Sequence, residues 1–201
     1  MTTLAFAVAA TIKHDGHGGV ADLLSTPEAA AAWLAEHEQL VAHVLGSDLG
    51  RFVHPNRAEI FPNTGDELVQ IRRAVRALFA RAVAPGAPSK ADAGRLMDVE
   101  DALRMVNRAA DELGTTHLEW AEAPVLRWAH RTEDPVALLI GAVGRSVIDF
   151  LAGPDRARLR ACPAARCVKY FLQDDPRQTW CSPACGNRER VNRHYRRRTA
   201  G

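Results

Sequence analysis

The sequence predicts a mainly α-helical protein with a small β component, in which a helical N-terminal body precedes a small cysteine-rich module. Three observations support this class. Apolar residues recur at steps of three and four along several segments of the first 153 residues, as on one face of a helix. One short stretch near residues 116–129 is instead rich in Trp, Val and Leu around a turn, which favours strands. The four cysteines of the 201-residue chain all fall within residues 162–185.

The first 46 residues contain an apolar start and one capped helix. Residues 4–12 fit either a strand or a short buried helix, because periodicity cannot separate the two in so short a run. Residues 14–19 are predicted to be a loop from their glycines. A helix is then predicted from Pro27 to Gly46, because Thr26 or the preceding serine can cap it and proline has the φ angle of a first helical turn.

Two further helices are predicted after an irregular stretch at residues 48–63. The first begins at Thr64, which forms a capping box with Glu67. Its outer, solvated face is expected to carry Arg72, Arg73, Arg76 and Arg81. The second helix is predicted from Ser89, as its cap, to Leu113. Its apolar face is expected to comprise Leu96, Val99, Leu103, Val106 and Ala110.

A β-hairpin and a last helix complete the predicted body. Residues 116–129 form the hairpin, with Trp120 and Trp128 packed in the core or across the strands. The last helix, capped by Asp134, spans residues 135–153 and is the most hydrophobic, so it is expected at the centre of the body. No run reaches the roughly 18 apolar residues of a membrane span. A secretory signal has a positively charged residue before its apolar region, and none precedes the apolar start of this sequence. We therefore expect a cytoplasmic protein without membrane contact.

The chain is predicted to divide at Gly153–Pro154 into a body of residues 1–153 and a module of residues 154–201, which starts with a short helical turn. The net charge of +2 hides an asymmetry between the two. Residues 155–201 contain 12 Lys and Arg residues and four Asp and Glu residues, a net charge of +8, and the remaining 14 basic and 20 acidic residues give the rest −6. This asymmetry indicates that the module, rather than the body, meets a polyanion.

The cysteines form two close pairs separated by a short spacer. They are Cys162, Cys167, Cys181 and Cys185. This spacing suits one Zn²⁺ held by four thiolates, and in a reducing compartment clustered cysteines bind metal more often than they form disulfides. Four protein ligands leave no open position, so the predicted site is structural rather than catalytic. Buried cysteines without metal are the alternative interpretation.

The residues around the cysteines predict how the module is built. Residues 168–172 are β-prone and are expected to pair, through a turn, with residues 178–180. Ser182 then caps a final helix with Pro183 at its first position, which places Cys185 in the first turn. Two ligands from a tight knuckle and two from a helix N-terminus are the arrangement of a treble-clef zinc finger.

The final helix is rich in arginine, a residue that pairs well with phosphate and with guanine edges. Val191 and Tyr195 are expected to pack on the hairpin of the module, which leaves an outward surface of guanidinium groups. The predicted nucleic-acid-binding residues are Asn187, Arg188, Arg190, Arg193, His194, Arg196, Arg197 and Arg198. The alternative is a solvated basic tail, or a face that packs on the acidic body.

The sequence Cys185-Gly-Asn-Arg188 also carries a family resemblance. The segment from Leu159 to Arg198 resembles the CGNR zinc-finger family. The preceding body resembles the ABATE-like domain, through Ser25–Ala29 and Trp33–Leu34. The resemblance implies a mostly helical body, zinc on the four cysteines, and the role of a stress-induced bacterial transcription regulator that binds DNA.

These features predict a zinc-finger DNA-binding transcription regulator whose body senses a small ligand or mediates dimerisation. A zinc-stabilised adaptor is one alternative, in which the arginines bind an acidic protein. RNA binding is another. An enzyme is not expected, because the sequence has no Ser/His/Asp order, glycine-rich nucleotide loop or paired carboxylates in a recognisable context.

Overall fold

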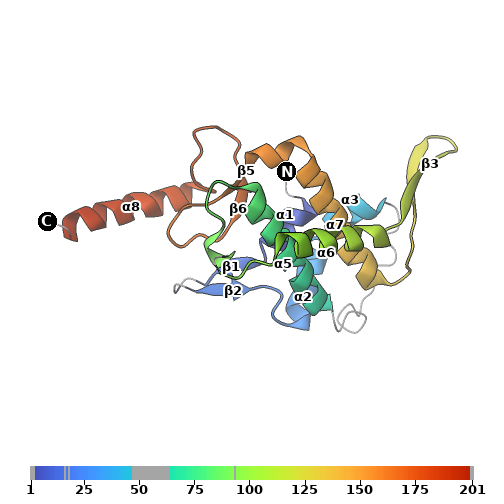
Figure 1. The fold of residues 1–201 in the computed structure, drawn as a ribbon, viewed down its shortest axis with the longest axis horizontal. Helices are drawn as coiled ribbons and strands as arrows, with labels where there is room; N and C mark the ends of the chain where they lie inside the picture. Colours follow the sequence, from blue (N-terminus) through green and yellow to red (C-terminus); the bar gives the residue numbers. More distant parts are fainter. Residues whose placement is uncertain (1–2, 16, 18, 47–63, 93, 200–201) are drawn as a thin grey trace.

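The computed structural model describes residues 3–15, 17, 19–46, 64–92 and 94–199, and within them it confirms the predicted class: a helical body with few strands, followed by the cysteine module (Figure 1). The irregular stretch predicted at residues 48–63 lies outside the described residues. The helices are α1 (Leu4–Ala9), α2 (Pro27–Glu36), α3 (Glu38–Leu45), α5 (Thr64–Ala82), α6 (Val99–Glu112), α7 (Pro135–Ala152) and α8 (Pro183–Thr199), with 3-10 turns η2 (Lys90–Asp92) and η3 (Pro154–Arg158).

The strands in the described part of the chain form three separate antiparallel pairs. The pairs are β1 (Ile12–His14) with β2 (Val20–Asp22), β3 (Thr115–Trp120) with β4 (Pro124–Ala129), and β5 (Leu159–Ala161) with β6 (Tyr170–Leu172). None of these pairs forms a layer of its own, so the architecture is set by the packing of the helices.

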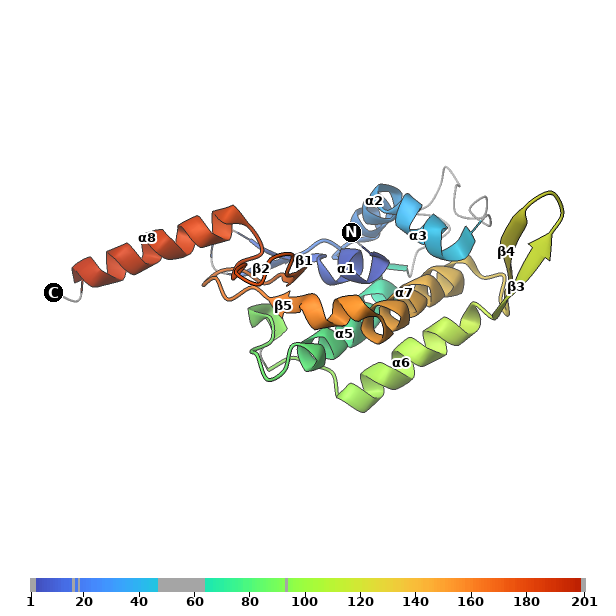
Figure 2. The same cartoon turned by 90° about the horizontal axis from the view of Figure 1, so that it is seen from above.

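Helix α7 lies at the centre of the body, as predicted, against α1, α3, α5 and α6 (Figure 2). The carboxylate of its cap, Asp134, accepts hydrogen bonds from the backbone N–H groups of Val136 and Ala137. Among the described helices, α7 alone is long and apolar enough to cross a membrane by length and composition. However, 56% of it is buried within the body. A helix that is apolar on most sides and largely buried is the core helix of a globular body.

Glycines allow α6 and α7 to approach closely. A Cβ atom added at Gly144 would stand 2.8 Å from the carbonyl oxygen of Val106 and 3.0 Å from the backbone nitrogen of Ala110. At Gly141 it would stand 2.9 Å from the carbonyl oxygen of Ala109. Any larger residue at these two positions therefore has to push the helices apart.

The apolar N-terminal stretch begins as the short helix α1, one of the two forms that its sequence allowed. Leu4 and Val8 are fully buried, and the ring of Phe6 packs on those of Phe79 and Phe150. Of the residues predicted to form a loop, His14 ends β1, and Asp15 and Gly19 lie between β1 and β2. The pairing of β1 with β2 is a hairpin that the sequence analysis did not predict. The pairing Ile12↔Asp22 closes this hairpin next to α5, where Asp22 meets a buried arginine.

The single helix predicted from Pro27 to Gly46 is wrong, because the chain forms two helices that meet at His37. Thr26 caps α2 as predicted, accepting from the N–H of Ala29. At His37 the backbone leaves helical geometry, with φ −109° and ψ 14°. The imidazole Nδ1 lies 2.8 Å from the carbonyl oxygen of Trp33, and the His37 ring stacks on the indole. The His37 side chain therefore lies at hydrogen-bonding distance from a carbonyl oxygen in the last turn of α2, as basic residues near helix C-termini often do.

The solvated basic face predicted for α5 is wrong at two of its four arginines. Arg73 and Arg81 are exposed, whereas Arg72 and Arg76 are each only 4% exposed. Both are buried because carboxylates from other elements pair with them: Asp22 with Arg72 and Asp92 with Arg76. Lys and Arg are almost never buried without such partners.

The third predicted helix begins later than Ser89. Helix α6 starts at Val99, and the Asp98 carboxylate accepts from the first free N–H groups, those of Glu100 and Asp101. Its buried face consists of Ala102, Val106 and Ala109. The predicted apolar positions Leu96 and Leu103 are 43% and 45% exposed. Asp98 is the stronger cap because a carboxylate at the helix N-terminus also gains from the helix dipole.

The predicted hairpin is confirmed and projects from the body (Figures 1 and 2). Trp128 packs against the body as predicted, and its indole N–H donates to the carbonyl oxygen of Val44 at 3.0 Å. Trp120 does not: it lies next to the turn, opposite Pro124, and is 72% exposed. The difference follows from position, because only the base of the hairpin reaches the body.

The start of the cysteine module is built into the body. The predicted pairing of residues 168–172 with residues 178–180 is wrong, because β6 pairs instead with β5, which precedes the first cysteine. This register places Leu159 and Tyr170 in the same buried cluster as the body helices. Within the module, helix α8 extends away from the body (Figure 1).

Candidate metal centre and basic helix

The four cysteine sulfurs converge on one point. All four Sγ atoms lie within 4.8 Å of one another. The Sγ of Cys181 lies 3.6 Å from the Sγ of Cys167 and 3.6 Å from the Sγ of Cys185. A tetrahedral zinc site with Zn–S bonds of about 2.3 Å has sulfur–sulfur distances of about 3.8 Å, whereas a disulfide needs about 2.05 Å. The donor set and its spacing therefore fit one Zn²⁺ and not a pair of disulfides.

The clustered sulfurs shift the pKa values of one another. A hydrogen bond from the Cys167 thiol lowers the pKa of Cys162 to about 5, and the same contact raises the pKa of Cys167. Burial, followed by the charge of Cys162, raises the pKa of Cys181 to about 11. The raised pKa values of Cys167 and Cys181 favour their protonated thiols in the absence of a cation. A divalent cation binds them deprotonated, and its binding releases protons.

Local structure explains how the ligands are positioned. The Ser182 hydroxyl oxygen accepts from the N–H of Cys185 at 3.3 Å, which confirms the predicted cap and places this ligand in the first turn of α8. Cys162 and Cys167 flank a turn in which the N–H of Cys167 donates to the carbonyl oxygen of Ala164. A small apolar cluster surrounds the sulfurs, formed with Ala164, Phe171 and Trp180. Two ligands from a knuckle and two from a helix start confirm the treble-clef arrangement.

Residues of the body contact the turn from Cys162 to Cys167, which we call the zinc knuckle. The sequence analysis did not find these contacts. The ammonium group of Lys90 lies 2.9 Å and 2.7 Å from the carbonyl oxygens of Pro163 and Ala164. The Ser89 hydroxyl donates to the carbonyl oxygen of Val168 at 2.8 Å. These contacts attach the cysteine module to the body at several points. No local signal marks them, since the partners are more than 70 residues apart in sequence.

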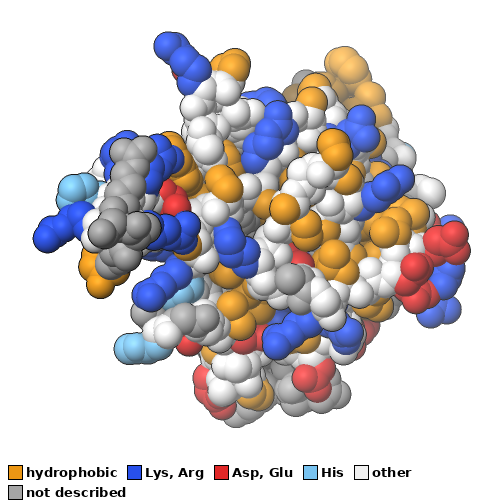
Figure 3. Space-filling view, turned by 60° about the vertical axis from the view of Figure 1, so that its left-hand side comes forward, with side chains coloured by type: hydrophobic (Ala, Val, Ile, Leu, Met, Phe, Trp, Pro, Cys, Tyr) orange, Lys and Arg blue, Asp and Glu red, His pale blue; other side chains and the backbone are white. Residues whose placement is uncertain are grey.

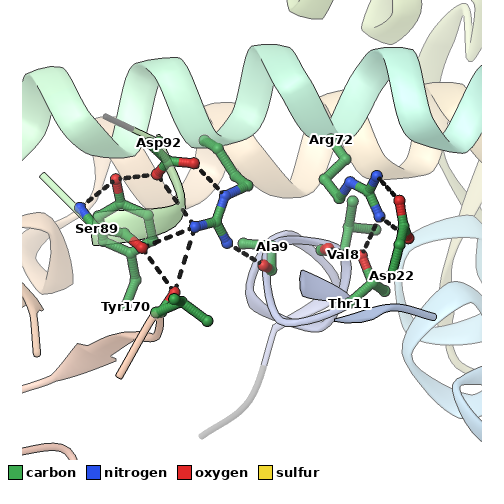
Figure 4. A network of polar contacts seen from close by, with 10 residues as sticks. Val8, Ala9, Thr11, Asp22, Arg72, Ser89, Asp92 and Tyr170 are labelled. Carbon is green, nitrogen blue, oxygen red and sulfur yellow. Dashed lines mark hydrogen bonds and ion pairs between the residues drawn. The ribbon is translucent and has the colours of Figure 1, made fainter. Parts of the chain in front are cut away.

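Arg76 lies at the centre of this junction (Figure 4). Its guanidinium forms a two-point ion pair with Asp92, at 2.6 Å and 3.1 Å. It also donates to the carbonyl oxygen of Ala9 at 2.6 Å and to the Ser89 hydroxyl at 2.9 Å. Tyr170 closes the network by donating to Asp92 at 2.7 Å. One buried arginine therefore links α1, α5, η2 and the strand that leads out of the zinc knuckle.

The basic helix α8 presents the residues that were predicted to bind nucleic acid. Described side chains at these positions are exposed, namely those of Asn187, Arg188, Arg190, Arg193, His194, Arg196 and Arg198. Arg197 lies on α8, but its side chain is outside the described ones. The prediction that Val191 and Tyr195 pack on the module is wrong, because they are 67% and 69% exposed. Helix α8 extends away from the rest of the module (Figure 2), so these two side chains remain largely exposed.

A helical body joined to a four-cysteine finger with a basic helix is the architecture of a zinc-finger regulatory protein. Residues 2–154 match the ABATE family, described as a putative stress-induced transcription regulator, and residues 158–198 match the CGNR zinc finger. The first match spans most of the chain, which therefore belongs to the ABATE family. The match and the sulfur geometry together assign one structural Zn²⁺ to the four cysteines. No curated protein matches the chain, and neither family description names a catalytic activity.

Proposed function

We propose that the protein is a cytoplasmic, non-enzymatic transcription regulator whose finger binds duplex DNA through α8, while the body binds a ligand or a second copy of the chain. The observation that carries this proposal is the surface of α8. Exposed guanidinium groups follow the helix beyond the zinc ligands, and the apolar side chains of Val191 and Tyr195 are mostly exposed beside them. Such a helix provides phosphate contacts through arginine and apolar contacts to base edges through Val191 and Tyr195.

Zinc supports this function by fixing where α8 begins. A module of about forty residues cannot bury enough surface to fold alone, and structural zinc supplies about 10–16 kcal/mol of binding free energy. Cys181 and Cys185 would hold the first turn, so the direction of the arginine rows depends on the metal. The metal itself takes no part in recognition, because its four positions are filled by sulfur.

A titration of labelled duplex DNA at several salt concentrations tests the proposal. We expect affinity to fall linearly on a log–log plot as salt rises, as it does for proteins that contact phosphates. Joint replacement of Arg193, Arg196 and Arg197 by Ala should abolish most of this affinity, while Arg104→Ala on α6 should leave it unchanged. If the zinc-loaded protein ignores duplex DNA at low salt, the proposal fails. Preference for structured RNA or for an acidic protein in the same titration would support those alternatives.

A further inference from the structure

We infer that the DNA-binding surface continues beyond α8 into a basic groove between the zinc knuckle and the body, which we call the knuckle groove. Its basic side chains are His14, Lys90, Arg95, Arg166, Arg188 and Arg196. The inference rests on the proposed function and deepens it: the groove takes the phosphodiester backbone of the DNA that α8 engages. Four of these residues, His14, Lys90, Arg95 and Arg166, lie outside the helix predicted to bind nucleic acid.

The groove consists of two adjoining cavities that share His14, Ala165 and Arg166 in their walls. The larger has a volume of about 630 Å³ and opens along α8, where Arg188 and Arg196 line it. The smaller has a volume of about 280 Å³ and extends the groove to η2 of the body. Figure 3 shows Lys and Arg side chains gathered around α8, and further ones spread among apolar and uncharged side chains on the neighbouring face. Basic side chains therefore line both cavities, from α8 to η2.

The residues that line the two cavities of the knuckle groove favour an anionic ligand. Among the described residues that line the two cavities there is no Asp or Glu. Like charges gathered in one groove repel one another, and this repulsion is relieved when an anion binds. Arg72 and Arg76 are buried against the carboxylates of Asp22 and Asp92. Arg95 and Arg166 are exposed in the groove instead, which is typical of phosphate-binding positions.

The walls are held in place by contacts behind them. The Glu189 carboxylate on α8 accepts from the N–H of Ala165 at 2.7 Å, which ties the helix to the knuckle. Lys90 donates to the carbonyl oxygens of Pro163 and Ala164 and so ties the knuckle to η2. The arginines thus project from a fixed frame. Such preorganisation lowers the entropy lost when a ligand binds.

The size and shape of the groove favour a polymer over a single small anion. One phosphate group cannot fill a cavity of about 630 Å³, and Arg196 and Arg95 line different cavities of the groove. A phosphodiester chain places successive phosphates along such a surface. The groove also lies beside the helix proposed to enter the DNA, so both contacts can be made by one duplex.

The salt dependence of DNA binding tests the inference with a labelled duplex and the zinc-loaded full-length protein. Each phosphate contact that is lost reduces the slope of log affinity against log salt by about 1. We expect a reduction of about 1 for Arg95→Ala, about 1 for Arg166→Ala and about 2 for the double variant. Arg108→Ala, an exposed arginine on α6, serves as the matched control and should leave the slope unchanged.

The outcomes separate this inference from the proposed function. If the wild type binds DNA and the double variant keeps the wild-type slope, the knuckle groove is not a phosphate site, while the role of α8 stands. If the wild type binds no DNA, both proposals fail. Zinc content and far-UV circular dichroism are measured for every variant. Should Arg166→Ala lose zinc, Arg95→Ala decides the question alone, because Arg95 belongs to the body rather than to the cysteine module.

Discussion

Replacement of Arg76 by Met should destabilise the protein more than any other exchange of an arginine on α5. The change keeps an unbranched side chain but removes the partner of Asp92, a carboxylate whose residue is only 6% exposed. It also removes the donors to the carbonyl oxygen of Ala9 and to the Ser89 hydroxyl. Breaking a buried ion pair by deleting one member costs about 3–5 kcal/mol, because the other charge stays buried.

That loss is large compared with the total stability of about 5–15 kcal/mol that is typical of folded proteins. For a chain of this size it corresponds to a fall in melting temperature of about 6–20 °C. Urea unfolding followed by circular dichroism measures the change, and the dependence on urea concentration should keep its slope if both forms unfold in one step. Arg73→Met is the control, since Arg73 lies three residues earlier on the same helix and is exposed, and it should change the stability by less than about 0.5 kcal/mol.

A double variant isolates the cost of leaving the Asp92 charge buried without its partner. With Asp92→Asn added, the buried charge is gone, so the double variant should lose about 1–3 kcal/mol less than the two single losses added together. A loss of less than about 1 kcal/mol for Arg76→Met, the value of an exposed ion pair, would contradict a buried and coupled pair. Simple additivity of the two stability losses would contradict it as well.

The remaining predictions concern the metal, the helix packing and pH. Cys185→Ser should lower zinc content below one per chain and reduce the helicity contributed by α8, measured by elemental analysis and circular dichroism; full zinc retention would contradict the assigned ligand set. Gly144→Ala should destabilise by about 1–3 kcal/mol through overpacking against α6, although helix propensity alone predicts a gain of about 1 kcal/mol. Burial of Asp22 acts to raise its pKa, but hydrogen bonds from Arg72 and the N–H of Leu24 outweigh it and leave the pKa below 3.8. Its contribution is therefore present above pH 3.8 and lost as the pH falls further, so Asp22→Asn should flatten the acid limb of the stability curve. Burial, followed by the charge of Asp92, raises the pKa of Tyr170 above 10.0. Stability should accordingly decline as the pH rises beyond 10, and Tyr170→Phe should remove part of that decline.

The metal site could be predicted from the sequence because its information is local. Four cysteines at knuckle spacing, with Ser182 and Pro183 before the last, define both the ligands and the helix that carries one of them. The caps at Thr26 and Asp134 were found for the same reason, since each acts within three residues. Local signals of this kind do not depend on how the rest of the chain folds.

The junction between body and finger could not be predicted, because its partners are far apart in the chain. Arg72 and Arg76 have the helical spacing of a polar face, and amphipathic analysis assigns such positions to solvent. Their burial depends on Asp22 and Asp92, which only the tertiary fold brings beside α5. The pairing of β6 with β5 has the same origin, because β-prone residues do not specify which strand they will join.

If α8 binds duplex DNA as proposed, the attachment of the knuckle through Lys90 affects which DNA sites are selected. A finger on a long linker can adopt many orientations, whereas this finger would be oriented by the body to which it is attached. In a symmetric pair of chains joined through their bodies, the separation of the two α8 helices would be a fixed length. Proteins that place two recognition helices at a fixed separation select operators whose half-sites are spaced to match, about one helical turn of 34–36 Å or a multiple of it. The body would then set the half-site spacing that the pair of chains can bind. A ligand that changes the relative orientation of the two bodies would change that spacing.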